Sequence, residues 1–389
     1  MIAYAGLIPC LLLLIVCRGE KAPRLELLQV LFQNGDRTPT SEERYPTDPY
    51  DDDYWKHMGY GVLTYHGKKR AYELGRVLRR EYDDFLGEYS EEKVYPYSAD
   101  FSSSKQTLAW VLTGVYPLGE EAQEEWSDPM PLRSFTMPHQ PDRRNCFKPP
   151  RLHCRKYQKL LEHARRSAEM WRELIKYENF TACVRSETQV SYALPDNPSV
   201  AATHLLDNLR AVSSMGLERP GWCATRDCTD NLYSLASLDY DAQVQSAEMR
   251  RLFVGTILQV LLHNIEQGGA GDKKIYLFSA LACNLAAVAR VLGMLDDVPA
   301  VPSYADALIL EKLRDETDAE QVYVRARYYE AATASLLPVK MTYNSKIGKL
   351  IKCLKCTKYC HHKCPLETFR RIVKPTRPTD EDYDCDIAI

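Results

Sequence analysis

The chain has 389 residues, of which 45% are hydrophobic, so it can bury one sizeable core and has the length for two lobes. Its formal net charge of -3 leaves no basic surplus of the kind that binds nucleic acid or an anionic membrane, and we expect neither as a partner. There is no internal repeat and no low-complexity tract. The composition is that of an ordinary globular protein.

The N-terminus predicts secretion. An apolar stretch that includes Leu11–Val16 runs for about 14 residues, too short for a comfortable membrane span. The triplet Cys17-Arg18-Gly19 then suits signal-peptidase cleavage, so residues 1–19 are predicted to be a signal peptide. An N-terminal anchor or a buried helix is the alternative. We expect a secreted, extracellular protein, with the lysosomal lumen as the other possible location, and no membrane span later in the chain.

The cysteines agree with an oxidising compartment. Of the 13 cysteines, Cys10 and Cys17 lie in the predicted leader and the rest spread from Cys146 to Cys385. Most of these should be paired, and their odd number predicts one free thiol or an intermolecular bond. The triplet that begins at Asn179 is a candidate glycosylation site.

The hydrophobic pattern predicts alternating strands and helices at both ends of the chain and a helical block between them. The first element is a buried strand over Leu25–Phe32, which runs into the loop at Asn34-Gly35-Asp36. The predicted helices are Gly67–Phe85, Ser103–Val115, Tyr157–Tyr177, Ser199–Met215, Gln243–Gln267 and Leu285–Leu295, and the further strands are Lys93–Tyr97, Ile275–Ser279, Ala307–Leu313 and Val322–Tyr329.

This order of elements predicts an α/β fold with a mostly parallel sheet flanked by helices. We expect residues 20–117 and 246–389 to form the α/β domain, and residues 118–245 to form an inserted all-helical lobe. Ligands of open α/β sheets bind beyond the carboxyl ends of the strands. In this chain those ends are Gln33–Arg37 and Ala280–Ala282.

The segment Val30–Pro39 (VLFQNGDRTP) resembles the R-H-G-x-R-x-P signature of histidine acid phosphatases, including the secreted and lysosomal enzymes of arthropods. Three later segments resemble further blocks of this family: Leu63–Gly75, Tyr97–Pro117 and Cys364–Phe369. The resemblance covers essentially all of the mature chain in order. It implies the histidine phosphatase fold, which is similar to that of phosphoglycerate mutase, and a possible homodimer.

The resemblance also implies a mechanism in which a histidine takes the phosphoryl group, arginines neutralise its oxygens and an aspartate protonates the leaving alcohol. This chain departs from that pattern at five of six positions. Arg37 is retained, whereas the other family positions are occupied by Gln33, Asn34, Ser103, Leu281 and Ala282. An asparagine amide has no basic lone pair to attack phosphorus, and loss of a nucleophile costs on the order of 10^6 in turnover.

These departures predict that the chain is not an enzyme but a secreted pseudo-phosphatase that acts by binding. Arg37 is the candidate anion-binding residue, with a structural ion pair as the alternative. Cys283, just beyond Ala282, is expected to be a buried free cysteine rather than a nucleophile. A histidine and a carboxylate that converged on Arg37 from elsewhere in the chain would overturn this interpretation.

Two other hypotheses stay open: an active acid phosphatase that hydrolyses phosphomonoesters, and a structural component of a secreted fluid such as venom. No cofactor is expected, and the partner is an unknown protein or a small anionic ligand.

The resemblance implies two disulfides, Cys154–Cys385 and Cys360–Cys364. The tail between Cys353 and Cys364 also has zinc-like ligand spacing, but we favour disulfides and predict no metal site. The pairing of the other cysteines cannot be deduced from their spacing.

Overall fold

The computed structural model of the chain describes residues 22–118, 132–137, 146–190, 197–268, 273–343, 351–352 and 363–383. The predicted leader, residues 1–19, lies outside these ranges. Among the helices of the described ranges, none combines the length and apolar character that crossing a bilayer requires.

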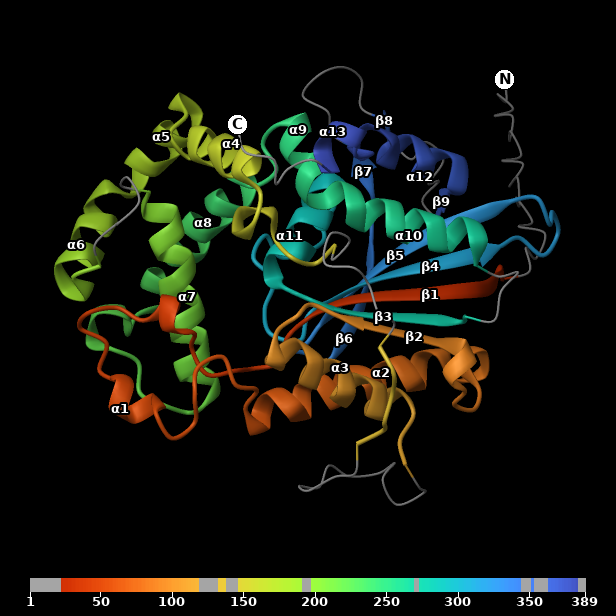
Figure 1. Ribbon diagram of the computed structural model, residues 1–389, viewed down its shortest axis with the longest axis horizontal. Coiled ribbons are helices and arrows are strands. Elements are labelled where there is room, and N and C mark those ends of the chain that lie inside the picture. Colours follow the sequence, from red (N-terminus) through yellow and green to blue (C-terminus); the bar gives the residue numbers. More distant parts are fainter. Residues whose placement is uncertain are drawn as a thin grey trace, which may run out of the picture.

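A seven-stranded mixed sheet forms the centre of the fold (Figure 1). Its order is β2-β3-β1-β4-β5-β6, and a short strand, β9, also pairs with β5. The strands are β1 (Arg24–Gln33), β2 (Val94–Ser98), β3 (Ile275–Ala280), β4 (Ala307–Arg314), β5 (Val322–Glu330), β6 (Ser335–Val339) and β9 (Lys363–Pro365), and a separate pair is formed by β7 (Thr342–Tyr343) and β8 (Ile351–Lys352).

The α/β fold class is confirmed, but the expectation of a mostly parallel sheet needs correction. Strands β2, β3 and β1 are parallel to one another, whereas β4, β5, β6 and β9 pair in the antiparallel sense. Helices connect the parallel strands, since a parallel pair needs a crossover. Short loops join β4, β5 and β6, so the chain reverses direction at each of them.

Helices cover both faces of the sheet (Figure 1). Helices α2 and α3 lie on one face, and α10, α11 and α12 lie on the other. The α-helices are α1 (Asp52–Trp55), α2 (Tyr65–Leu86), α3 (Ser102–Val115), α4 (Arg155–Arg165), α5 (Ala168–Leu174), α6 (Glu178–Thr188), α7 (Pro198–Ser214), α8 (Arg226–Ala242), α9 (Ala247–Arg250), α10 (Thr256–Gln267), α11 (Ala282–Val291), α12 (Leu366–Val373) and α13 (Asp380–Tyr383).

Helices α4 to α8 gather beyond the carboxyl end of β1 (Figure 1). Their buried residues, such as Leu205 and Leu232, belong to the same core cluster as the sheet face under α10 and α11. The predicted helix Tyr157–Tyr177 is divided into α4, α5 and a 3-10 turn. The helix predicted over Gln243–Gln267 is confirmed from Ala247 onward, where α9, a π-helical turn (Arg251–Gly255) and α10 follow one another without a break.

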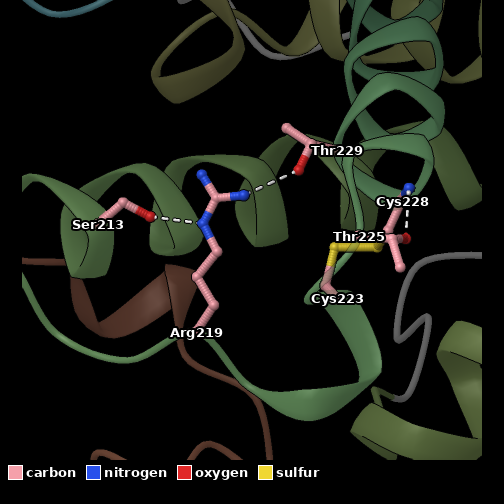
Figure 2. Close-up of a disulfide and its surroundings, with 6 residues drawn as sticks. All are labelled: Ser213, Arg219, Cys223, Thr225, Cys228 and Thr229. Atoms are coloured by element: carbon pink, nitrogen blue, oxygen red, sulfur yellow. Dashed lines mark hydrogen bonds between the residues drawn. A yellow bond between two sulfur atoms is a disulfide. The ribbon is translucent and has the colours of Figure 1, made fainter.

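A disulfide between Cys223 and Cys228 fixes the start of α8 (Figure 2). The preceding loop is held by Arg219, whose Nε donates to Ser213 Oγ of α7 at 2.7 Å and whose Nη1 donates to Thr229 Oγ1 of α8 at 3.1 Å (Figure 2). The disulfide and this guanidinium together join the two helices across their connecting loop.

The two predicted disulfides, Cys154–Cys385 and Cys360–Cys364, each have only one cysteine within the described residues. Cys154 is disulfide-bonded and Cys364 is buried, whereas Cys385 and Cys360 lie outside the described residues, so both implied pairs stay predictions. The tail segment considered for zinc also lies largely outside the described residues. Free thiols occur at Cys146 and Cys283, which are buried, and at Cys183, which is exposed on α6.

Two glycines allow the loop after β1 to touch the start of α2. A Cβ added to Gly67 would lie 2.0 Å from the carbonyl oxygen of Asp36, and one added to Gly35 would lie 2.3 Å from the carbonyl oxygen of Gly67. Real side chains do not tolerate such distances, so the backbone contact requires glycine on both sides. This contact positions the loop that carries Asp36 and Arg37.

We expect Gly67→Ala to destabilise the fold by about 1–3 kcal/mol or more, since the new methyl group has to push backbone away from backbone. Urea denaturation followed by circular dichroism measures this loss. Gly221→Ala is the matched control, because nothing lies within 4 Å of a Cβ added there. Equal stability of the two variants would contradict the close approach.

Candidate active site

The sheet brings the two predicted crevice segments together. Strands β1 and β3 are parallel neighbours, and Gln33 pairs with Ala280 at their carboxyl ends. Asn34 therefore follows β1 at the same edge at which Leu281 and Ala282 follow β3. Leu281 precedes α11, and its backbone N–H donates to Asn284 Oδ1 at 3.0 Å. This edge of the sheet, where the crevice is predicted, is thus built from a strand end, a helix start and the loop between β1 and α2.

Asn34 is held by the first turn of α3. Its Nδ2 donates to Ser103 Oγ at 3.2 Å, and its Oδ1 accepts a hydrogen bond from Ser104 at 2.8 Å. All three side chains are buried. The structure therefore joins Asn34 directly to Ser103, and hydroxyl groups satisfy both ends of the amide.

Arg37 forms a buried two-point ion pair with Glu43 of the 3-10 turn Ser41–Glu43. Its Nη1 and Nη2 donate to the two carboxylate oxygens at 2.8 and 2.6 Å, and Nη1 also donates to the Thr38 carbonyl at 3.1 Å. Only 14% of the Arg37 side chain and 7% of the Glu43 side chain are exposed. The Arg37 guanidinium also lies 5.9 Å from the centre of the buried Tyr304 ring. A cation is thereby fixed at the crevice.

Asp36 points elsewhere and pairs with Arg70 of α2 at 3.1 Å. Burial raises the pKa of Asp36, and the charge of Arg70 offsets this only in part. Its Oδ2 is buried without a hydrogen-bond partner in the described residues. Asp36 therefore does not neutralise Arg37, although the two are neighbours in sequence. Glu43, six positions after Arg37, does so instead.

Helix α7 brings a histidine and a carboxyl group to this ion pair. His204, Asp207 and Arg210 are three residues apart on one face of α7, which packs on the turn that carries Glu43. Asp207 Oδ1 lies 3.7 Å from Arg210 Nη1, and about a fifth of each side chain is exposed. His204 is half-buried.

The charges of this cluster act on one another. Burial and the negative charge of Glu43 raise the pKa of Asp207, while Arg210, Arg37 and His204 oppose the rise. Burial would also raise the pKa of Glu43, but the hydrogen bond and charge of Arg37, together with the charge of His204, hold it below its ordinary value. The cluster thus contains one carboxylate that stays ionised in acid and one carboxyl that keeps its proton to higher pH.

Cys283 lies in the first turn of α11, directly after Ala282. It is buried, and Arg151 Nη1 approaches its sulfur to 3.6 Å. Its burial and its free thiol agree with the expected buried cysteine. Among the described residues, no three His, Cys, Asp or Glu side chains lie where they could share a metal ion.

Sequence reasoning found the strand ends and Arg37 but missed Glu43, His204 and Asp207. The spacing of His204, Asp207 and Arg210 was a usable signal, since it places the three titratable residues of α7 on one face of the helix. Nothing in the sequence says which strand end that face meets.

Residues 24–329 match the model of the "Histidine phosphatase superfamily (branch 2)". The chain belongs to this family. The match begins with β1 and ends within β5, so it includes both strand ends of the crevice and the whole of α7.

Named relatives match the chain over nearly its whole length. Testicular acid phosphatase of Mus musculus is 30% identical over 97% of this chain and 86% of its own length. Lysosomal acid phosphatase of Homo sapiens is 27% identical over 96% and 83%. Venom acid phosphatase Acph-1 of Apis mellifera is 26% identical over 93% and 88%.

Solved structures support the fold. The phytase of Citrobacter braakii is 16% identical, with a TM-score of 0.67 over 94% of this chain and 100% of the phytase. The Hafnia alvei phytase in complex with tartrate has a TM-score of 0.69 over 94% and 99%, also at 16% identity.

These comparisons overturn the prediction that the chain is not an enzyme, because the proteins that it matches from end to end are named acid phosphatases.

The Arg37–Glu43 pair gives a test of how the crevice is held. Glu43→Gln leaves a buried guanidinium without its counter-charge, which costs about 3–5 kcal/mol. A folded-state pKa below the ordinary value means that Glu43 stabilises the protein above pH 4.5 and loses this effect as the pH falls through its folded pKa. Wild type and variant should therefore differ in urea denaturation at pH 7 and converge in acid.

Asp230→Asn is the control, because it removes an exposed ion pair with Arg226 and should change stability by less than about 1 kcal/mol. A Glu43→Gln variant as stable as this control at pH 7 would show that the pair does not hold the crevice.

Proposed function

We propose that the chain is an acid phosphatase that hydrolyses phosphomonoesters with Arg37, His204 and Asp207. The observation that carries this proposal is that α7 packs on the turn of Glu43, where the charge of His204 acts on Glu43 and Asp207, and the charge of Arg37 acts on Asp207. The names of the relatives support the substrate class.

Arg37 binds the phosphoryl oxygens. A guanidinium has about five N–H donors, and its bonds to Glu43 and to the Thr38 carbonyl use three of them. The remaining donors are available to phosphate oxygens. Glu43 stays ionised at acidic pH, so it continues to hold the guanidinium in place while substrate binds.

His204 and Asp207 carry the chemistry. Residues three apart on a helix have Cβ atoms roughly 5–6 Å apart, which leaves room for a phosphoryl group beside both side chains. The His204 imidazole attacks phosphorus and the P–O ester bond breaks, while Asp207 gives its proton to the departing alcohol. Water then attacks phosphorus and the P–N bond breaks, which frees His204; the water gives one proton to the Asp207 carboxylate and inorganic phosphate leaves.

Asn34 takes no part in bond making in this scheme. Its amide is committed to Ser103 and Ser104, and it keeps the end of β1 attached to α3. Variants of His204 and of Asn34 therefore distinguish this proposal from one in which Asn34, at the position of the family's histidine, takes part in catalysis.

We further propose that the protein works in the lysosomal lumen or outside the cell. The predicted leader, the disulfide between Cys223 and Cys228, the exposed acceptor Asn179 and the lysosomal and venom relatives support this. An acidic compartment also suits a proton donor such as Asp207, since burial raises its pKa.

Turnover of p-nitrophenyl phosphate at about pH 5 tests the proposed nucleophile. His204→Asn should lower kcat on the order of 10^6-fold, to background, because it removes the attacking imidazole. His263→Asn, at an exposed position on α10, is the matched control and should leave kcat unchanged. Asn34→Ala should retain turnover within a few-fold.

An inactive wild-type protein would overturn the proposed hydrolysis. Activity that survives in His204→Asn but disappears in Asn34→Ala would reassign the chemistry to the end of β1.

The pH profile tests the proposed proton donor. Only the protonated carboxyl can donate, so kcat should fall as the pH rises through the raised pKa of Asp207. Asp207→Asn should lower kcat by about 10^2–10^4 and remove this alkaline limb. Ionisation of Asp207 also destabilises the folded protein, so the variant should melt above wild type at pH 8, with the difference shrinking as the pH falls. An unchanged alkaline limb would contradict the assignment.

A further inference from the structure

A basic, aromatic pocket lies along the outer side of α2, away from the crevice. It encloses about 1070 Å³, close to the size of sites that hold small ligands. Five cations line it, against three carboxylates: Lys69, Arg76, Arg79, Arg80 and Arg133 against Glu73, Asp83 and Glu88. None of these residues belongs to the crevice described above.

Two of the arginines are held in fixed positions over aromatic rings. The Arg133 guanidinium lies 4.1 Å from the centre of the Tyr89 ring, and its Nε donates to the Tyr116 carbonyl at 2.7 Å. Arg79 lies 5.7 Å from the centre of the Tyr116 ring and donates to the Gly87 carbonyl at 2.6 Å. Positioned guanidinium groups lose little freedom when they bind an anion.

Three further cations of α2 supply charge beside them, whereas Arg79 itself forms an ion pair with Asp83. Arg76 and Arg80 are one helical turn apart, and Lys69 lies two turns before Arg76. Within the described ranges, none of these three side chains forms an ion pair. Arg76 is half-buried, whereas Lys69 and Arg80 are exposed, so their charged ends are accessible from solvent.

One lining residue, Tyr116, has a buried hydroxyl group without a hydrogen-bond partner in the described residues. Tyr116 is only 3% exposed, and its hydroxyl makes no hydrogen bond in the described part of the chain. Burial raises the pKa of Tyr116 to about 12, so this hydroxyl keeps its proton at physiological pH.

We propose that this pocket is a second anion-binding site, which takes a small molecule with two or more phosphate groups. Several guanidinium groups arranged along one helix suit a ligand with several phosphate groups better than a ligand with one, because each phosphate can accept hydrogen bonds from a different guanidinium. The site lies on the face of the sheet covered by α2 and α3 (Figure 1), so it is separate from the proposed hydrolysis at the crevice.

Calorimetric titration of the full-length protein with inorganic tripolyphosphate, at pH 8 and low salt, tests the proposal. Arg76→Gln combined with Arg80→Gln should weaken binding at least tenfold. Arg172→Gln combined with Lys176→Gln removes the same charge at the same spacing on the helical lobe and should leave binding unchanged. Orthophosphate, with one phosphate group, should bind wild type at least tenfold more weakly than tripolyphosphate.

A further double variant, Arg37→Gln with Glu43→Gln, removes the cation proposed to bind phosphoryl oxygens at the crevice. It should lose any binding there and keep the tripolyphosphate binding that Arg76→Gln with Arg80→Gln weakens. Circular dichroism confirms that each variant is folded. The proposal is overturned if tripolyphosphate does not bind, if the Arg172 and Lys176 pair weakens binding as much as the Arg76 and Arg80 pair, or if only the crevice variant loses binding.

Discussion

The buried ion pair between Arg37 and Glu43 is the interaction on which the crevice depends. It connects the loop after β1 to the 3-10 turn on which α7 rests, and it keeps a cation at the carboxyl edge of the sheet. The positive charges of Arg37 and His204 lower the pKa of Glu43, and the same three groups act on the pKa of Asp207. Removing any one of them therefore changes the pKa of the carboxyl groups that remain. The loop is equally constrained on its other side, where Gly35 and Gly67 bring backbone against backbone. The crevice is thus fixed by contacts between segments distant in sequence.

Much of the fold could be predicted because its central strands and the helices against them carry strong periodic patterns. The apolar runs of β1 and β3 and the periodic face of α2 predict elements whose ends agree with the structure to within about two residues, the ordinary uncertainty of such boundaries. Helix α8 was missed because its first two turns, Arg226–Leu232, contain mostly polar residues around one disulfide cysteine. The antiparallel half of the sheet could not be read from the strands themselves, since β4 is buried along most of its length, a pattern shared with parallel strands.

The candidate site was predicted in part. Strand ends and the signature arginine follow from local sequence, and the structure brings them to one edge. The position of α7 does not follow from local sequence, because it depends on the packing of two segments about 160 residues apart on the chain. The hydrogen bond between Asn208 of α7 and Asp48 spans the same separation. The prediction that the chain is not an enzyme rested on which residues occupy the family's catalytic positions, whereas the family match and the named acid phosphatases extend over most of the chain.

The proposed function requires that a histidine of α7 takes the phosphoryl group. Its most direct test is to quench the protein with alkali during turnover of a phosphomonoester and to locate the phosphoryl group by tandem mass spectrometry, since phosphohistidine survives in base. The account predicts phosphorylation of His204. A phosphoryl group on any other residue during turnover would contradict it.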